Sequence, residues 1–118
     1  MIIGIGIDII ELSRVQEIIN NQPRFVDRIL TPAEKEVYVT LTNHRKVEFL
    51  AGRFSAKEAF SKAIGTGIGK EVSFQDISIL SDELGKPVMK CVGEHRFIHV
   101  SISHSQHYAV SQVIIEER

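Results

Sequence analysis

The sequence predicts an α+β fold, because one strand opens the chain, helical patterns follow and further strands close it. Residues 3–9 alternate with the period of two that is typical of a strand. Residues 13–64 carry apolar side chains at helical spacing, and alternation returns from Ile77 onward. Because strands and helices do not alternate, we expect an antiparallel strand meander after the helices, not a doubly wound parallel sheet.

Length, charge and cysteine content limit the function classes. The 118 residues predict a single compact domain over 1–118. Fourteen Lys and Arg against 15 Asp and Glu give a net charge of −1, which argues against a nucleic-acid partner. The apolar run from Met1 to Ile7 is too short to cross a bilayer, so no membrane partner is expected. A lone cysteine, Cys91, favours a cytoplasmic location.

The first strand has two unlike faces. One face carries only isoleucines, and the other carries Gly4, Gly6 and Asp8. Glycines at this spacing leave room for close approach of another segment or a ligand. A carboxylate within an apolar strand needs a partner such as a metal ion, and the alternative is that Asp8 caps the following helix.

Three helical segments are expected after this strand. Ser13 is positioned to cap a helix that runs to about Asn20, and a basic, apolar segment follows at 24–30. Thr31 and Glu34 have capping-box spacing, which predicts a helix ending near 41–43. The longest helix is predicted over 44–64, with Gly65 as its left-handed terminator.

Glu58 and Lys62 lie one turn apart on the long helix. Their order favours a surface ion pair, while Glu58 together with Asp8 could instead form an oxygen-ligand site for Mg²⁺. The glycine-rich stretch 65–69 follows the helix, so a helix N-terminus cannot help it to bind phosphate. A phosphate there would need cations, and the alternative is a simple helix stop and turn. The candidate cations on this helix are Lys62, Arg53 and Arg45.

The C-terminal third is predicted to form strands at 77–80, 88–92, 96–103 and 108–115, the last two as a hairpin. His104 at the hairpin bend is a candidate phosphate contact. His95 and His99 would lie about 13 Å apart along a strand, too far to share a zinc ion.

A basic and apolar patch is predicted near the first helix. It suits an acidic protein helix better than DNA, which calls for a denser cluster of positive charge, and a solvated face is the alternative. Its residues are Arg14, Ile18, Arg24, Phe25 and Arg28.

Two motifs together resemble the 4′-phosphopantetheinyl transferase family, in its short type. The stretch 4–8, Gly-Ile-Gly-Ile-Asp, is similar to the first motif of that family. The stretch 54–63, Phe-Ser-Ala-Lys-Glu-Ala-Phe-Ser-Lys-Ala, running into Gly65-Thr66-Gly67, is similar to the second and more specific one. The likeness spans essentially the whole chain.

This resemblance implies Mg²⁺-dependent transfer of the phosphopantetheine arm of coenzyme A to a serine of an apo acyl carrier protein, in fatty acid biosynthesis. The products are the holo carrier protein and adenosine 3′,5′-bisphosphate. Asp8 and Glu58 then hold the metal, Glu58 accepts the serine proton directly or through a water, and Lys62 helps to hold the phosphates.

The resemblance also implies positions for the coenzyme and for two protein partners. Arg45 and Arg53 become candidates for the 3′-phosphate, and the basic patch becomes the docking site of the carrier protein's acidic helix. The short type forms a homotrimer with active sites between subunits. The coenzyme cleft is then lined by Gly65, Thr66, Gly67, Pro87 and His104.

One position departs from the long, two-lobed members of the family. They carry a further acidic residue two positions after the aspartate, where this chain has Ile10. A non-catalytic adaptor that grips an acidic helix through the patch is the main alternative to the enzyme, because it needs neither Asp8 nor Glu58. A sensor that binds coenzyme A without reacting is the third hypothesis.

Overall fold

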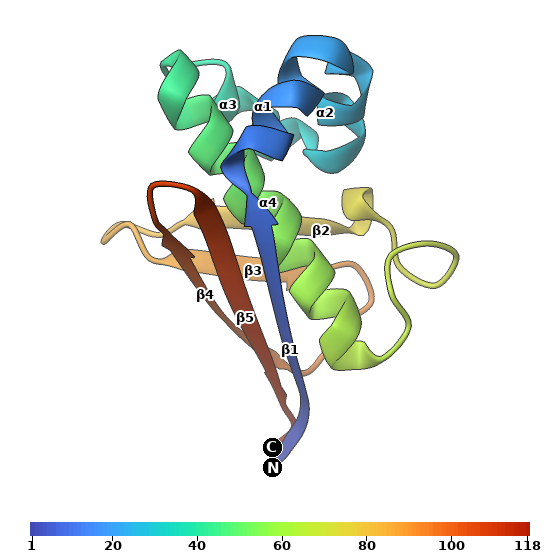
Figure 1. Ribbon diagram of the computed structural model, residues 1–118. Helices are drawn as coiled ribbons and strands as arrows, with labels where there is room; N and C mark the ends of the chain where they lie inside the picture. The colour runs from blue at the N-terminus through green and yellow to red at the C-terminus, as the bar shows by residue number, and fades with distance from the viewer.

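Two antiparallel sheets and one long helix form the body of the molecule, seen here in a computed structural model that describes residues 1–118 (Figure 1). One sheet has the strand order β1-β5-β4, and the other pairs β2 with β3. The predicted meander is therefore split between two sheets, with the N-terminal strand paired to the C-terminal one. The elements are β1 (Ile2–Glu11), α1 (Leu12–Asn21), α2 (Pro23–Ile29), α3 (Pro32–Tyr38), α4 (Asn43–Ile64), the 3₁₀ turn η1 (Phe74–Asp76), β2 (Ile77–Ser81), β3 (Pro87–Cys91), β4 (Phe97–His104) and β5 (Tyr108–Glu116).

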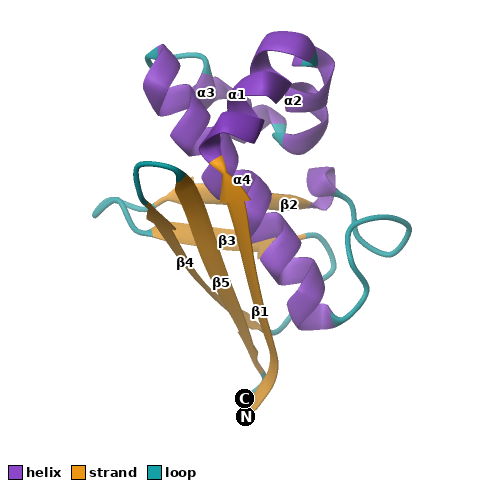
Figure 2. Cartoon of the chain, viewed as in Figure 1, coloured by secondary structure: helices purple, strands orange, loops and turns teal.

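The short helices α1, α2 and α3 gather around the N-terminal half of α4, and the sheets flank the rest of it (Figure 2). Two apolar clusters correspond to these parts. One joins the short helices to the start of α4, and the other lies between α4 and the sheets. No helix is long and apolar enough to span a bilayer.

The glycines of β1 allow α4 to pack directly on the strand. A Cβ atom at Gly6 would clash with the carbonyl oxygen of Ala59, and one at Gly4 would clash with that of Ala63. The close approach predicted from the glycine spacing is confirmed, and the segment that approaches is α4. Asp8 lies on the same face of β1 and therefore points toward the helix that carries Glu58.

The isoleucine face of β1 points away from α4 and is open in the single chain. Ile3, Ile5, Ile7 and Ile9 are between 41% and 63% exposed. Across the sheet, Ile5 pairs with Ile114 of β5 and Ile9 pairs with Val110. An apolar strip of this kind is unusual on a lone domain, since exposed apolar patches mark interaction surfaces.

Several element boundaries differ from the predictions. The first helix begins at Leu12 with Glu11 as its N-cap residue, so neither Ser13 nor Asp8 caps it. The basic segment at 24–30 forms α2, because Pro23 supplies a favourable first helical residue. The third helix ends at Tyr38, earlier than predicted.

The predictions for the long helix are confirmed. It starts within one residue of the expected position, and Gly65 ends it with φ of 86°. The capping box of α3 is also confirmed, with Thr31 and Glu34 each bonding to the other's backbone N–H.

Candidate active site

Asp8 and Lys62 form an ion pair between β1 and α4. The Lys62 Nζ lies 2.9 Å from Asp8 Oδ1 and also donates to the carbonyl oxygen of Ile7 at 3.0 Å. The Asp8 side chain is 15% exposed and that of Lys62 is 52% exposed. Lys62 thus pairs with the strand and not with Glu58, so the predicted i,i+4 surface pair does not form.

Glu58 stands beside this ion pair, one helical turn before Lys62. Burial raises the pKa of Glu58, the Asp8 carboxylate raises this pKa further, and Lys62 lowers it. A carboxyl group with a raised pKa is better suited to accept a proton than an ordinary surface glutamate. The structure therefore brings together Asp8, Glu58 and Lys62, which the sequence analysis placed in one site.

The donor set of this site fits Mg²⁺. Two carboxylates that face one site without a cation between them favour a divalent cation there, and Mg²⁺ is commonly held by one or two carboxylates together with substrate phosphates. Ile10, two residues after Asp8, is a buried core residue and contributes no ligand. The side chains that could hold such an ion are therefore those of Asp8 and Glu58.

The glycine-rich loop begins directly after the turn that carries Lys62. The backbone N–H groups of Gly65, Thr66 and Gly67 all bond to the Ser61 carbonyl oxygen at 3.0–3.3 Å. These amides serve to terminate the helix, as the stop-and-turn alternative supposes. The Thr66 hydroxyl donates to the Gly67 carbonyl, so the loop is shaped by its own bonds.

A cavity of about 750 Å³ lies at the other half of α4. Three of the predicted coenzyme contacts, Arg45, Arg53 and His104, line it. Pro87, a fourth, pairs with Ser81, which also lines the cavity. The other lining residues include acidic and apolar side chains: Ala33, Glu36, Val37, Leu41, Glu48, Phe49 and Leu80.

The side chains of Arg53 and His104 are held in place in this cavity by contacts with neighbouring residues. The Arg53 guanidinium stacks on Phe49, with 3.9 Å between its central carbon and the ring centroid. His104 Nε2 lies 3.0 Å from the Glu48 carbonyl oxygen. The cavity therefore presents positive charge beside an aromatic ring, an arrangement suited to a phosphorylated nucleotide.

The predicted coenzyme contacts thus fall into two groups on one chain. Lys62 lies at the carboxylates and the glycine loop follows it at the end of α4, whereas Arg45, Arg53 and His104 lie in the cavity. Arg53 and Lys62 are nine residues apart on α4, which is about 14 Å along a helix axis.

The basic patch lies on α1 and α2, immediately after the strand that carries Asp8. Arg24, Phe25 and Arg28 border a shallow depression of about 430 Å³, and the Arg28 guanidinium lies over the Phe25 ring at 5.9 Å. Arg14 is exposed on α1, and Ile18 packs partly against the helical core. The patch is connected to the carboxylate site through the chain itself, since α1 begins at Leu12, directly after β1.

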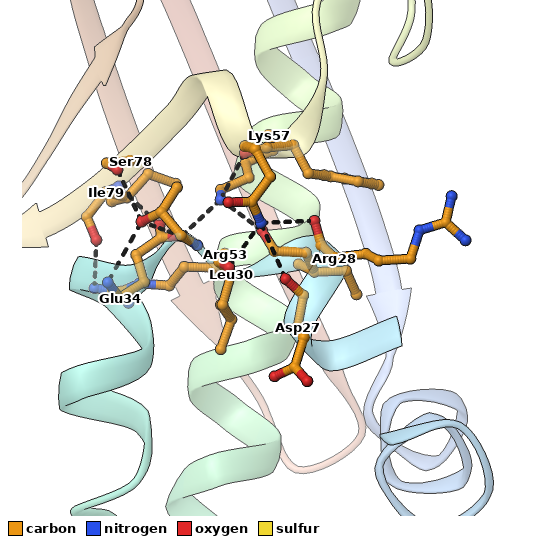
Figure 3. Close-up of polar contacts among 12 residues, drawn as sticks. Asp27, Arg28, Leu30, Glu34, Arg53, Lys57, Ser78 and Ile79 are labelled. Atoms are coloured by element: carbon orange, nitrogen blue, oxygen red, sulfur yellow. Dashed lines mark hydrogen bonds and ion pairs between the residues drawn. The ribbon is translucent and has the colours of Figure 1, made fainter. Parts of the chain in front are cut away.

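Sequence reasoning missed one pair of charged residues. Glu34 and Lys57 are both fully buried and form an ion pair between α3 and α4 (Figure 3). Glu34 was recognised only as part of a capping box. Lys57 lies one turn after Phe54 on the apolar side of the long helix, and this position was a signal that its charge is buried.

Comparison with known proteins identifies a family over nearly the whole chain. The family model described as the 4′-phosphopantetheinyl transferase superfamily matches residues 4–114. A holo-[acyl-carrier-protein] synthase from Geobacillus sp. (strain WCH70) is 60% identical over 116 residues, covering 98% of both chains. One from Anoxybacillus flavithermus is 59% identical, covering 98% of this chain and 97% of the relative.

Solved structures agree with the sequence relatives. A crystal structure of a holo-(acyl-carrier-protein) synthase from Bacillus anthracis, in complex with CoA (3′,5′-ADP), superimposes with a TM-score of 0.95 at 52% identity. It covers 100% of this chain and 99% of that one. A Helicobacter pylori holo-[acyl-carrier-protein] synthase in complex with coenzyme A gives a TM-score of 0.83 at 33% identity, covering 95% and 99% of the two chains.

Proposed function

The chain belongs to the 4′-phosphopantetheinyl transferase superfamily and is an enzyme of the holo-[acyl-carrier-protein] synthase group, and from this premise we propose its reaction. It transfers the 4′-phosphopantetheine arm of coenzyme A to a serine of an apo acyl carrier protein. The observation that carries the proposal is the meeting of Asp8, Glu58 and Lys62 between β1 and α4. The pathway served is fatty acid biosynthesis, and the compartment is the cytoplasm.

The reaction replaces one phosphorus–oxygen bond with another. The serine oxygen bonds to the phosphorus next to the pantetheine arm, and the bond to the bridging oxygen of the pyrophosphate breaks. Adenosine 3′,5′-bisphosphate leaves with that bridging oxygen, and the serine proton must go to a base. No covalent bond to the enzyme forms at any stage.

Each residue of the site has a part in this exchange. Glu58 accepts the serine proton, since burial and the Asp8 charge raise its pKa and with it its affinity for a proton. Lys62 is positioned to neutralise phosphate oxygens, because its ammonium group already lies at the carboxylate site. Asp8 and Glu58 are the residues that would hold Mg²⁺, and the ion would supply positive charge for the negative charge that develops on the pyrophosphate.

The carrier protein docks on the basic patch of α1 and α2. Arg14, Arg24 and Arg28 supply positive charge for an acidic helix, while Ile18 and Phe25 supply apolar contact. Because β1 runs directly into α1, a carrier held there is next to the strand that bears Asp8. Its serine can therefore approach Glu58.

The working form is a homotrimer. The isoleucine face of β1 is the observation that supports this assembly, since it leaves an apolar strip exposed on the single chain. The two groups of predicted coenzyme contacts are far apart on one chain. In a trimer they can form one binding site, because a neighbouring subunit brings its own cavity to the carboxylate site. Gly65, Thr66 and Gly67 then come from one subunit, and Arg45, Arg53, Pro87 and His104 come from its neighbour.

The release of adenosine 3′,5′-bisphosphate tests the proposal. The protein is incubated with coenzyme A, Mg²⁺ and an apo acyl carrier protein, and the nucleotides are separated by chromatography. We expect release of the bisphosphate with the carrier, and none with a carrier whose acceptor serine is replaced by alanine. Tight carrier binding without any release would instead support the adaptor hypothesis.

A further inference from the structure

A buried ion pair lies in the layer between the helices and the smaller sheet, outside the proposed carboxylate site. Glu34 and Lys57 have fully buried side chains, and Lys57 Nζ lies 2.6 Å from Glu34 Oε1. Burying two charges is costly, and replacing such pairs with apolar residues often leaves a protein equally stable or more so. Stability alone therefore does not account for this pair.

Lys57 uses all three of its N–H donors. Besides Glu34, its Nζ donates to the carbonyl oxygen of Ile29 at 2.7 Å and to that of Phe74 at 3.1 Å. Burial lowers the pKa of Lys57, and the adjacent Glu34 carboxylate acts in the opposite direction. The side chain thus fixes the middle of α4 to the end of α2 and to η1.

Glu34, the partner of Lys57, also bonds to the backbone of β2. Its Oε1 also accepts a bond from Thr31 N–H at 2.9 Å, and its Oε2 accepts one from Ile79 N–H at 2.8 Å. Glu34 therefore holds the central residue of β2 against the start of α3. Figure 3 shows the Glu34, Lys57 and Arg53 side chains converging from their two helices near Ile79.

Ile79 also contacts Arg53. The Ile79 carbonyl oxygen accepts a bond from an Arg53 terminal nitrogen at 3.3 Å. Arg53 Nε is buried without a partner, so this bond and the Phe49 ring fix the guanidinium. A shift of Ile79 would consequently move the guanidinium of Arg53 relative to the cavity that it lines.

We propose that Glu34 and Lys57 form a positioning pair for the coenzyme cavity, which holds Ile79 so that Arg53 presents its guanidinium to the bound nucleotide. Neither residue of the pair lines the cavity, so both act through Arg53. The inference rests on the proposed function, in which this cavity receives the nucleotide end of coenzyme A. Its claim concerns nucleotide affinity, in contrast to the chemistry at Glu58.

The test replaces the pair with neutral side chains, in a Glu34→Gln/Lys57→Met double variant of the full chain. Adenosine 3′,5′-bisphosphate is titrated by calorimetry, and steady-state transfer is measured in parallel. We expect the dissociation constant and the KM for coenzyme A to rise about tenfold, the size expected of one charge-assisted hydrogen bond. The kcat should change by less than about threefold, because the carboxylate site is intact. Lys90→Met, at an exposed lysine on β3, is the matched control and should change neither value.

An Arg53→Met background separates positioning from a general structural effect. If the pair acts through Arg53, adding Glu34→Gln and Lys57→Met to Arg53→Met should weaken nucleotide binding no further. Losses that simply add would show that the pair and Arg53 act independently and would overturn the proposal. Wild-type nucleotide affinity in a folded double variant would overturn it as well.

Two controls keep these outcomes interpretable. If the double variant does not fold, Glu34→Asp keeps the charge but withdraws the carboxylate from Ile79, and the same rise in dissociation constant is expected. The nucleotide titration does not require turnover. A wild-type protein that binds the nucleotide but transfers nothing would therefore contradict the proposed function while the positioning pair is still tested.

Discussion

Lys62 and Asp8 form an ion pair within the site that we propose for a metal ion. In the chain alone, the ammonium group of Lys62 balances the Asp8 carboxylate, while Glu58 keeps a raised pKa nearby. If Asp8 and Glu58 held a divalent cation, that cation would balance the Asp8 charge, and Lys62 would be free to contact substrate phosphates. The same three side chains are thus compatible with both the free and the loaded site.

Replacement of Glu58 by glutamine should separate chemistry from folding. Glu58→Gln removes the proton acceptor and one proposed metal ligand while keeping the side-chain size. We expect a transfer rate lower by roughly 100- to 10,000-fold, the range for loss of a general base, with an unchanged circular dichroism spectrum. Glu83→Gln, in an exposed turn, is the control. Near-normal turnover of Glu58→Gln would remove Glu58 from the mechanism.

At the scale of elements, the contact between β1 and α4 fixes the geometry of the site. Gly4 and Gly6 allow the strand to touch the helix backbone, so Asp8 on the strand reaches Lys62 on the helix. The glycine spacing and the period of two were enough to predict the close approach. They did not predict that α4 would be the approaching segment, because that depends on the packing of the whole chain.

A side chain at Gly6 should force these two elements apart. The Cβ atom of Gly6→Ala would meet backbone atoms of Ala59 and Ala63, which cannot rotate away. We expect a loss of about 3 kcal/mol in the free energy of unfolding, the upper range for overpacking, measured by urea denaturation. Ser13→Ala should change this free energy by less than about 0.5 kcal/mol, since Ser13 is exposed and makes no cap. An equally small effect of Gly6→Ala would contradict the packing described here.

The Glu94–Arg96 contact in the turn between β3 and β4 should make the free energy of unfolding depend on pH. Hydrogen bonds from Arg96 lower the pKa of Glu94 from 4.5 to about 2, so the folded state favours the ionised carboxylate. This contribution is fully present above pH 4.5 and is lost as the pH falls toward 2. The difference in urea midpoint between wild type and Glu94→Gln should therefore shrink as the pH is lowered from 7 to 3. A difference that is constant over this range would contradict the pKa assignment.

Local and long-range features differed in how well the sequence predicted them. The Thr31–Glu34 capping box and the Gly65 terminus were predicted because each depends on neighbours within a few residues. The Glu34–Lys57 pair was not, because its partners are 23 residues apart and meet only when α3 packs on α4. Likewise, the motif residues of the site were identified from their pattern. That Lys62 pairs with Asp8 and not with Glu58 could not be predicted, because it depends on how β1 packs on α4.

For the whole molecule, the open isoleucine face is the feature that the single chain leaves unexplained. Its residues are half exposed although they lie on the longest strand of the larger sheet. Burying them against copies of the same face would remove apolar surface from water, which is the main driving force for association. The separation of the predicted coenzyme contacts into two groups on one chain favours the same assembly.

A charge placed on this face should dissociate the proposed trimer. We expect wild-type protein to elute with light scattering at three times the 13.3 kDa chain mass, and Ile7→Lys to elute at the mass of one chain. Because a lone chain lacks its neighbour's cavity, Ile7→Lys should also lose most transferase activity while remaining folded. Ser101 of β4 is in register with Ile7 across β5 and lies on the same face, so Ser101→Lys tests whether the interface extends across the whole sheet. Wild-type protein that runs as a single chain would contradict the assembly.

The intact mass of an apo acyl carrier protein tests the central claim most directly. The carrier is incubated with coenzyme A and either the wild-type protein or the Asp8→Asn/Glu58→Gln variant, each with Mg²⁺ or with a chelator. The account predicts a gain of one phosphopantetheine group only with wild-type protein and Mg²⁺. An equal gain with the double variant, or in the presence of the chelator, would contradict a metal-dependent site at Asp8 and Glu58.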